Sequence, residues 1–201
     1  MHALSMSSLI EHRQCLDVAL AERDQFTENH CSRVEILSML LGQALGLPSL
    51  GQHHLRAASR LHDVGKIGIP DSILLKPGRF EPGEWEIMKT HSVLGQRICD
   101  AIPHESSAAI GLIVRHHHEF FDGRGYPDGL AGSHIPICAR IISIADCFDA
   151  ITDTRPYHSA RSPQVAMEII ESEVGYKYDP FVFELFQEVM RDQVRAAHDN
   201  Q

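Results

Sequence analysis

Apolar residues recur at three- and four-residue spacing along most of the chain, which predicts a protein built of helices. The first such run extends from Val34 to Leu45, with Thr27 as its expected N-cap and Gly46 and Pro48 at its end. Later helices are predicted at about 49–62, 82–100, 105–118 and 136–152, followed by two that open at Pro163 and Pro180 and are separated by Gly175.

Strand signals are poor. Only residues 66–70 look extended, and this stretch is too short to demand a sheet. Two loops are predicted, at 75–81 and 121–135, and the second is rich in glycine and directly follows three histidines. Long ordered loops beside polar clusters commonly carry function. The expected fold is therefore all-α, with one main domain over 27–201 and a helical lead-in or linker at 1–26.

Composition and charge narrow the class of protein. A hydrophobic share of 43% and a charged share of 22% are typical of a soluble globular protein. The net charge of −9 argues against binding to a nucleic-acid polymer, although a small anionic substrate stays compatible with it. The sequence has no signal-peptide pattern and no apolar run long enough to cross a membrane. Because the five cysteines are scattered, reduced thiols and a cytoplasmic location are expected.

The most informative acidic residue is Asp146, which lies in the strongly apolar segment 141–148. A lone carboxylate buried in such a helix costs several kcal/mol or takes up a proton. A metal ion would remove that cost. The alternative is an ordinary buried aspartate that is satisfied by an arginine or by backbone donors.

Histidines and aspartates of the same ligand type are spread along the chain. Taken one at a time, each is more often a helix cap or a solvated side chain. Imidazole and carboxylate ligands without thiolates favour Fe, Mn, Zn or Co, and two such ions ~3.5–4 Å apart suit phosphoester hydrolysis. Residue patterns alone leave open which two of the consecutive histidines 116–118 are ligands. The candidate set comprises His30, His62, Asp63, His91, two of His116, His117 and His118, and Asp146.

The order of these motifs resembles the HD-GYP family of the HD phosphohydrolase superfamily. The matching segments span most of the chain from about residue 26 to 190. They are Leu61–Asp71, Trp85–His91, His117–Glu119, Asp122–Gly129, Ile144–Asp146 and Arg155–Tyr157.

The resemblance implies a helical bundle of the HD type with a Gly-Tyr-Pro loop, which hydrolyses cyclic di-GMP to pGpG and, in some members, to GMP. It also implies two divalent ions, most often Fe or Mn, and aligns the family's histidine pair with positions that leave His116 outside. One ion would be held by His62, Asp63 and Asp146 with His30 nearby, the other by His91, His117 and His118, and Asp63 would bridge them.

Further roles follow from the same resemblance. Lys66 would stabilise the phosphate or protonate the leaving oxygen. Gly125, Tyr126 and Pro127 would line the substrate cleft, where an aromatic ring suits base stacking. Arg155 would grip a phosphate as a bidentate donor, and His158 stands where the family usually has Arg or Lys, so that grip is expected to be weaker or pH-dependent.

One departure bears on the number of metals, because Phe26 occupies a position where some members carry a glutamate that supports a third ion. Two ions are therefore expected. Two other functions stay open: a non-hydrolysing sensor of the nucleotide or of a partner such as a diguanylate cyclase, engaged through the Gly-Tyr-Pro loop, and a phosphohydrolase of another nucleotide. Residues 1–26 are a candidate dimer helix without a sustained heptad.

Overall fold

Helices make up the regular structure, as the apolar periodicity predicts, and the described residues contain no β-strand. The computed structural model describes residues 15–154, apart from 17, 21 and 24, and residues 160–199. The helices are α2 (Gln25–Ala44), α3 (Ser49–Leu61), η1 (Val64–Gly68), α4 (Asp71–Leu74), α5 (Pro82–Lys89), α6 (His91–Asp100), α7 (Ser107–His116), η2 (Gly132–His134), α8 (Ile137–Thr152), α9 (Pro163–Ser172) and α10 (Pro180–Asp199).

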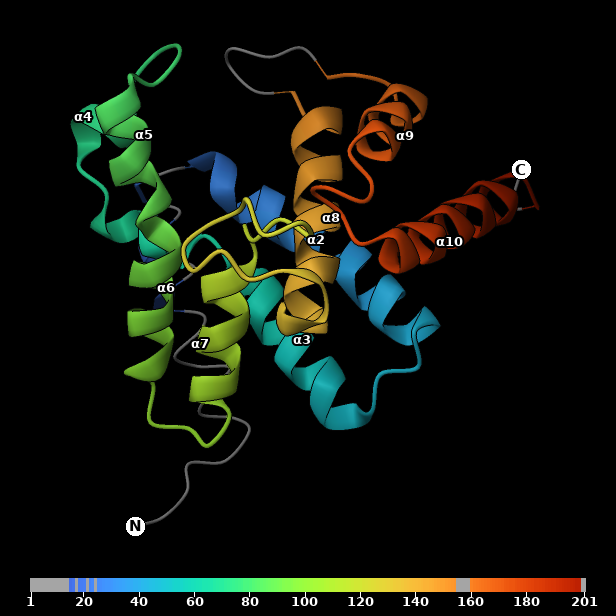
Figure 1. The fold of residues 1–201 in the computed structure, drawn as a ribbon, viewed down its shortest axis with the longest axis horizontal. Coiled ribbons are helices and arrows are strands. Elements are labelled where there is room, and N and C mark those ends of the chain that lie inside the picture. The colour runs from blue at the N-terminus through green and yellow to red at the C-terminus, as the bar shows by residue number, and fades with distance from the viewer. Residues whose placement is uncertain (1–14, 17, 21, 24, 155–159, 200–201) are drawn as a thin grey trace.

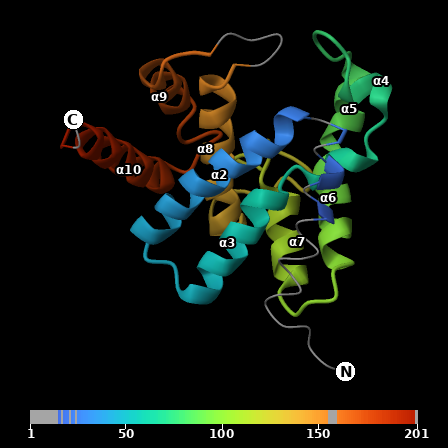
Figure 2. The same cartoon turned by 180° about the vertical axis from the view of Figure 1, so that it is seen from behind.

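Helix α8 runs through the middle of the molecule, with α6 and α7 on one side and α9 and α10 on the other (Figure 1). Seen from behind, α2 and α3 cover it (Figure 2). Its apolar residues Ile141, Ile142, Ile144 and Ala145 are fully buried, which explains why this segment is the most hydrophobic of the chain. Removing such side chains from water is the main force that holds the surrounding helices against α8.

Helix starts and stops largely follow the predicted signals. The Ser162 hydroxyl accepts a hydrogen bond from the Val165 amide at 3.3 Å, and Asp179 accepts one from the Phe181 amide at 2.9 Å. Between these two helices, Gly175 has φ +87°, a left-handed conformation that suits glycine. The prolines at 163 and 180 therefore open α9 and α10 as predicted.

Other boundaries differ from the prediction. Helix α2 begins at Gln25, so Thr27 lies within the helix and is not its N-cap. Of residues 66–70, only Ile69 and Pro70 are extended, because residues up to Gly68 form the 3₁₀ helix η1. The short helix α4 was not predicted, and α7 ends at His116.

The helix predicted over 82–100 is divided in two at Thr90. The Thr90 hydroxyl donates to the carbonyl of Ile87 at 2.6 Å, and the Thr90 amide donates to the same carbonyl, which ends α5. A new helix, α6, then begins with His91.

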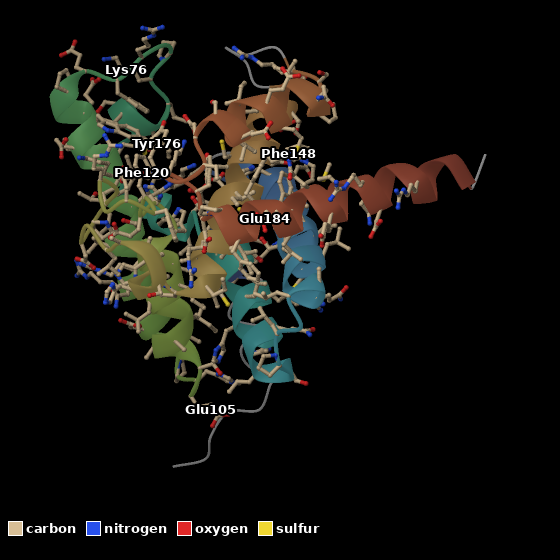
Figure 3. The ribbon with its side chains drawn as sticks, turned by 45° about the vertical axis from the view of Figure 1, so that its right-hand side comes forward. Lys76, Glu105, Phe120, Phe148, Tyr176 and Glu184 are labelled. Carbon is tan, nitrogen blue, oxygen red and sulfur yellow. The ribbon has the colours of Figure 1, made fainter. Side chains whose placement is uncertain are left out.

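The loop after α7 crosses the face of the molecule and meets the connection between α9 and α10. Figure 3 shows Phe120 and Tyr176 side by side at this junction, with ring centroids 6.4 Å apart. The amides of Phe121 and Asp122 donate to the carbonyls of Lys177 and Tyr176 at 3.1 and 2.9 Å. The loop is therefore held at its base by backbone hydrogen bonds.

A search for membrane spans gives a negative result. Within the described residues, no helix is both long and apolar enough to cross a bilayer.

Candidate metal centre

The seven residues expected to hold metal ions come together from five separate segments. His30 comes from α2, Asp146 from α8, and the others from the ends of α3, α6 and α7. Their rings are close neighbours: the centroids of His30 and His62, of His62 and His117, and of His91 and His117 are 5.3, 5.3 and 5.4 Å apart. The ring of His118 lies 5.0 Å from that of His91.

A turn at the end of α3 explains how two adjacent residues reach one site. His62 is still helical, but Asp63 has φ −95° and ψ 0°, so the chain changes direction between them. Both side chains are buried and both face the cluster. This is the geometry that the position of the His-Asp pair beside Gly65 predicts.

Gly65 allows η1 and α6 to approach more closely than any side chain would permit. A Cβ added to Gly65 would lie 1.8 Å from the backbone oxygen of His91, and one added to Gly95 would lie 3.5 Å from the Gly65 amide nitrogen. This approach leaves His91 Nε2 only 3.7 Å from Asp63 Oδ1.

Three histidines of the cluster are oriented in the same way. The Nδ1 atoms of His62, His91 and His117 lie 2.8, 2.8 and 2.6 Å from the carbonyl oxygen three residues earlier in the chain. A carbonyl oxygen can only accept, so each Nδ1 carries the hydrogen and each Nε2 carries a lone pair. Donation from the second ring nitrogen to a carbonyl is the usual support of a metal-binding histidine.

No hydrogen-bond donor among the described residues satisfies these Nε2 lone pairs. His62 Nε2 is buried and has no hydrogen-bond partner among the described residues. The Nε2 atoms of His91 and His117 face each other at 3.4 Å, although neither carries a hydrogen in this tautomer. A cation that accepts both lone pairs would remove this repulsion, so these residues fit a metal centre.

Asp63 connects the two halves of the cluster. Its Oδ2 lies 3.6 Å from His62 Nε2 and 4.0 Å from His30 Nε2, while its Oδ1 lies 3.7 Å from His91 Nε2. The two oxygens of one carboxylate therefore point to different groups of histidines. Asp146 Oδ1 lies 3.1 Å from His30 Nε2 and 3.9 Å from His62 Nε2.

The electrostatics keep the imidazoles neutral on one side of the centre. Burial lowers the pKa of His91 and of His117, and together with the nearby His91 it lowers the pKa of His118 to about 3. Although burial alone disfavours a charged His30, hydrogen bonds to Asp146 and Asp149 raise its pKa to about 9.

The carboxylates behave in the opposite way. Burial by itself raises the pKa of Asp63, but Lys66 and the surrounding histidines hold this pKa well below its usual range. Burial likewise raises the pKa of Asp146, but the hydrogen bond to His30 and the nearby His30, His62 and His118 together lower it below its usual range. Both groups therefore remain anionic, and anionic oxygen is a good ligand for a divalent ion.

Supporting side chains surround the cluster. Lys66 Nζ donates to Asp63 Oδ2 at 2.6 Å. Asp149 Oδ2 lies 2.7 Å from His30 Nδ1 and also accepts from Arg33, which fixes the ring of His30. Asp149 is buried and therefore supports His30 from the side away from Asp146 Oδ1.

The Gly-Tyr-Pro loop is held beside the cluster by Glu119, a residue for which no role was predicted. Its carboxylate accepts from the amides of Asp128, Gly129 and Leu130 at 2.7, 3.1 and 3.1 Å. Within the loop, Gly125 lies where a Cβ would come within 2.1 Å of the Phe120 amide nitrogen. A buried carboxylate with three backbone donors fixes a loop firmly.

His116, the first of the three consecutive histidines, helps to support this loop. His116 Nε2 lies 2.8 Å from Asp128 Oδ2, and Arg115 donates to both oxygens of Asp128 at 2.6 and 2.7 Å. The ligand atoms of His116, Glu119 and Asp128 could also hold an ion by proximity. Their carboxylates are already engaged by Arg115 and by backbone amides, so this group serves the loop.

The predicted substrate residues are described only in part. The ring of Tyr126 lies 4.9 Å from that of His118, so the Gly-Tyr-Pro loop does adjoin the cluster. Arg155 and His158 lie outside the described residues, as does the side chain of Phe26.

Comparisons with known proteins agree with this geometry. A model of the HD domain family matches residues 14–182. A cyclic di-GMP phosphodiesterase of Thermotoga maritima is 40% identical over 187 residues, which cover 92% of this chain and 50% of that protein. A 3′3′-cGAMP-specific phosphodiesterase 2 of Vibrio cholerae is 37% identical over 170 residues, 85% of this chain and 33% of that protein.

A solved structure shows the same fold. The protein Bd1817 of Bdellovibrio bacteriovorus, described as an HDG"Y"P protein, superposes with a TM-score of 0.66 at 20% identity, over 82% of this chain and 52% of that one. The chain spans about half the length of the Thermotoga relative and a third of the Vibrio relative.

Proposed function

This chain belongs to the HD domain family, in its HD-GYP branch, and from that premise we propose that it carries the active site of a metal-dependent phosphodiesterase of cyclic di-GMP. The observation that carries the proposal is the pair of Nε2 lone pairs on His91 and His117, which face each other at 3.4 Å beside two anionic carboxylates. A cation bound at this point would accept both lone pairs and balance the negative charge of the carboxylates.

The proposed centre holds two divalent ions. One is bound by His30, His62, Asp63 and Asp146, and the other by the ligands His91, His117 and His118. Asp63 bridges them, which its two oxygens support by facing different histidines. The ligand set favours Fe or Mn. Ions of this kind supply Lewis-acid polarisation of a phosphodiester and a nucleophilic water at neutral pH.

Lys66 has a role in proton transfer or charge stabilisation. Its ammonium group is fixed by Asp63 at the edge of the centre, so it presents donors to a phosphate oxygen or to the leaving oxygen. Tyr126, with Gly125 and Pro127, forms the adjoining wall, and Arg155 and His158 are proposed phosphate contacts. Hydrolysis opens one phosphodiester of the ring and yields pGpG; a second hydrolysis yields GMP.

A second substrate is favoured by a specific observation. The Vibrio relative is a phosphodiesterase specific for 3′3′-cGAMP, and it is 37% identical to this chain. The metal centre acts on a phosphodiester and does not read the base, so the same centre suits either cyclic dinucleotide.

The decisive test couples metal analysis to turnover. Protein prepared without oxygen is supplied with Fe or Mn, and the metal content is measured beside the hydrolysis of cyclic di-GMP, 3′3′-cGAMP and cyclic di-AMP. About two ions per chain with linear product from cyclic di-GMP is the expected result. Metal binding without turnover of any of the three would contradict the enzyme and favour a sensor.

Asp63→Ala is the matched variant. Loss of the bridging carboxylate is expected to abolish turnover and to lower the metal content below that of the wild type. Retention of full activity by Asp63→Ala would contradict the two-metal centre.

A further inference from the structure

A row of aromatic rings leads outward from the metal centre. It begins at His118 and continues to Tyr126, whose ring centroid is 4.9 Å away. Trp85 on α5 follows at 6.2 Å from Tyr126, with the two ring planes at 84°. Phe80 then lies 6.2 Å from Trp85, with the planes at 23°.

Tyr126 is not the ring best placed to receive a base. It lies against His118, and Lys89 Nζ is 5.7 Å from its ring centroid. The residue is half-buried, and burial raises the pKa of its hydroxyl. Phe80 is half-buried against a small apolar cluster that contains Met88.

Trp85, in contrast, is 44% exposed. An exposed indole on a surface is ordinary when it stands alone. This one is supported by Phe80 on one side and by Tyr126 on the other, and it lies two ring contacts from a proposed metal ligand. The side chain is therefore both fixed and available at the rim of the centre.

The helix α5 presents this group in a defined direction. Trp85 and Lys89 are four residues apart and share one face of the helix, and both contact Tyr126. Ile87 is similarly exposed, at 42%, but it lies on the opposite face of α5. One helix thus carries a candidate contact and a natural control.

We propose that the exposed part of the Trp85 indole stacks on one purine base of a cyclic dinucleotide whose phosphodiester lies at the metal centre. The inference rests on the proposed function. Planar bases stack on aromatic side chains with little regard to sequence, and removal of such a ring weakens binding markedly. Trp85 would therefore contribute substrate affinity and leave the hydrolytic step to the metal centre.

The chain contains a single tryptophan beside four tyrosines, so fluorescence excited at wavelengths that tyrosine does not absorb reports on Trp85 alone. Metal-loaded protein is mixed rapidly with cyclic di-GMP, and the emission is followed within the first turnover. Stacking predicts a saturable loss of emission. It also predicts that Trp85→Ala raises KM about 10- to 100-fold while kcat changes little, and that Trp85→Phe keeps most of the affinity. Ile87→Ala is expected to behave as the wild type.

The possible failures are distinguishable. If cyclic di-GMP is hydrolysed, but the Trp85 emission is unchanged and Trp85→Ala keeps the wild-type KM, the stacking role is wrong and the proposed function stands. If the wild type neither binds nor hydrolyses any cyclic dinucleotide, both are wrong. If Trp85→Ala does not fold, the emission of the wild type decides, and an unchanged emission again overturns the role.

Discussion

Replacement of Gly65 by alanine tests whether the contact between η1 and α6 sets the geometry of the metal centre. The added Cβ would lie 1.8 Å from His91 O, 2.5 Å from Gly95 N and 2.7 Å from His91 C. All three are backbone atoms, so no side chain can rotate away. Because real Cβ contacts essentially never fall below 3.0 Å, α6 must move away from η1 by about 1.2 Å, the difference between 3.0 and 1.8 Å.

The displacement reaches the centre directly, since His91 is the first residue of α6. A misplacement of about 1 Å at a reacting site can cost about 100-fold in rate. The overpacking itself is expected to cost about 1–3 kcal/mol. For a domain of this size, that corresponds to a fall in Tm of about 2–12 °C. Gly65→Ala should therefore lower both stability and turnover.

Thermal unfolding of the metal-free protein and hydrolysis of cyclic di-GMP by the metal-loaded protein measure the two effects separately. Gly83→Ala is the control: it lies in α5, and a Cβ added there meets nothing within 4 Å. Because alanine favours helices by up to about 1 kcal/mol, this variant should match or slightly exceed the wild type. A Gly65→Ala protein with wild-type Tm and wild-type turnover would refute the reasoning.

Three further predictions concern neighbouring features. His117→Ala should lower the metal content, whereas His116→Ala should leave it near normal, and elemental analysis compares the two; equal losses would contradict the separation. Glu119→Gln weakens three charge-assisted hydrogen bonds at a cost of about 1–3 kcal/mol, so hydrogen exchange of those loop amides should accelerate about 10- to 100-fold, while unchanged protection would remove the role of the carboxylate. Burial raises the pKa of Cys99 to about 12, so at pH 8 only about one Cys99 thiol in 10,000 is ionised. Iodoacetamide should therefore label the exposed Cys15 but not Cys99 in the folded protein, as mass spectrometry can show, and early labelling of Cys99 would contradict its burial.

The candidate ligands could be predicted because their signals are local. Asp146 lies in a strongly apolar segment, and His62 and Asp63 lie where a helix pattern meets glycine. Each signal depends only on neighbouring residues, and the resemblance to a known family supplied the assignment of the pairs. The fold class followed in the same way, since the period of apolar residues already distinguishes helix from strand.

The remaining features depend on contacts between distant segments. No glycine or proline marks the break at Thr90. The hydroxyl of Thr90 could make the same hydrogen bond within a longer helix, so the sequence does not reveal the break. Likewise, Glu119 is one acidic residue among many until its carboxylate meets three amides about ten residues further along the chain. The exposure of Trp85 is also a property of the packed molecule. Propensity and pattern carry no information about such contacts.

Backbone carbonyls orient three of the candidate histidine ligands. His62, His91 and His117 each lie three residues after a residue in the last turn of a helix. The free carbonyl oxygen of that earlier residue is therefore within hydrogen-bond distance of the histidine Nδ1. These carbonyls come from Ser59, Met88 and Val114, whose side chains have no part in the contact. The orientation of each of these three candidate ligands thus requires only that a histidine stands three residues after a residue in the last turn of a helix. What must be specific is the closeness of the helices, and Gly65 provides it where α6 meets η1.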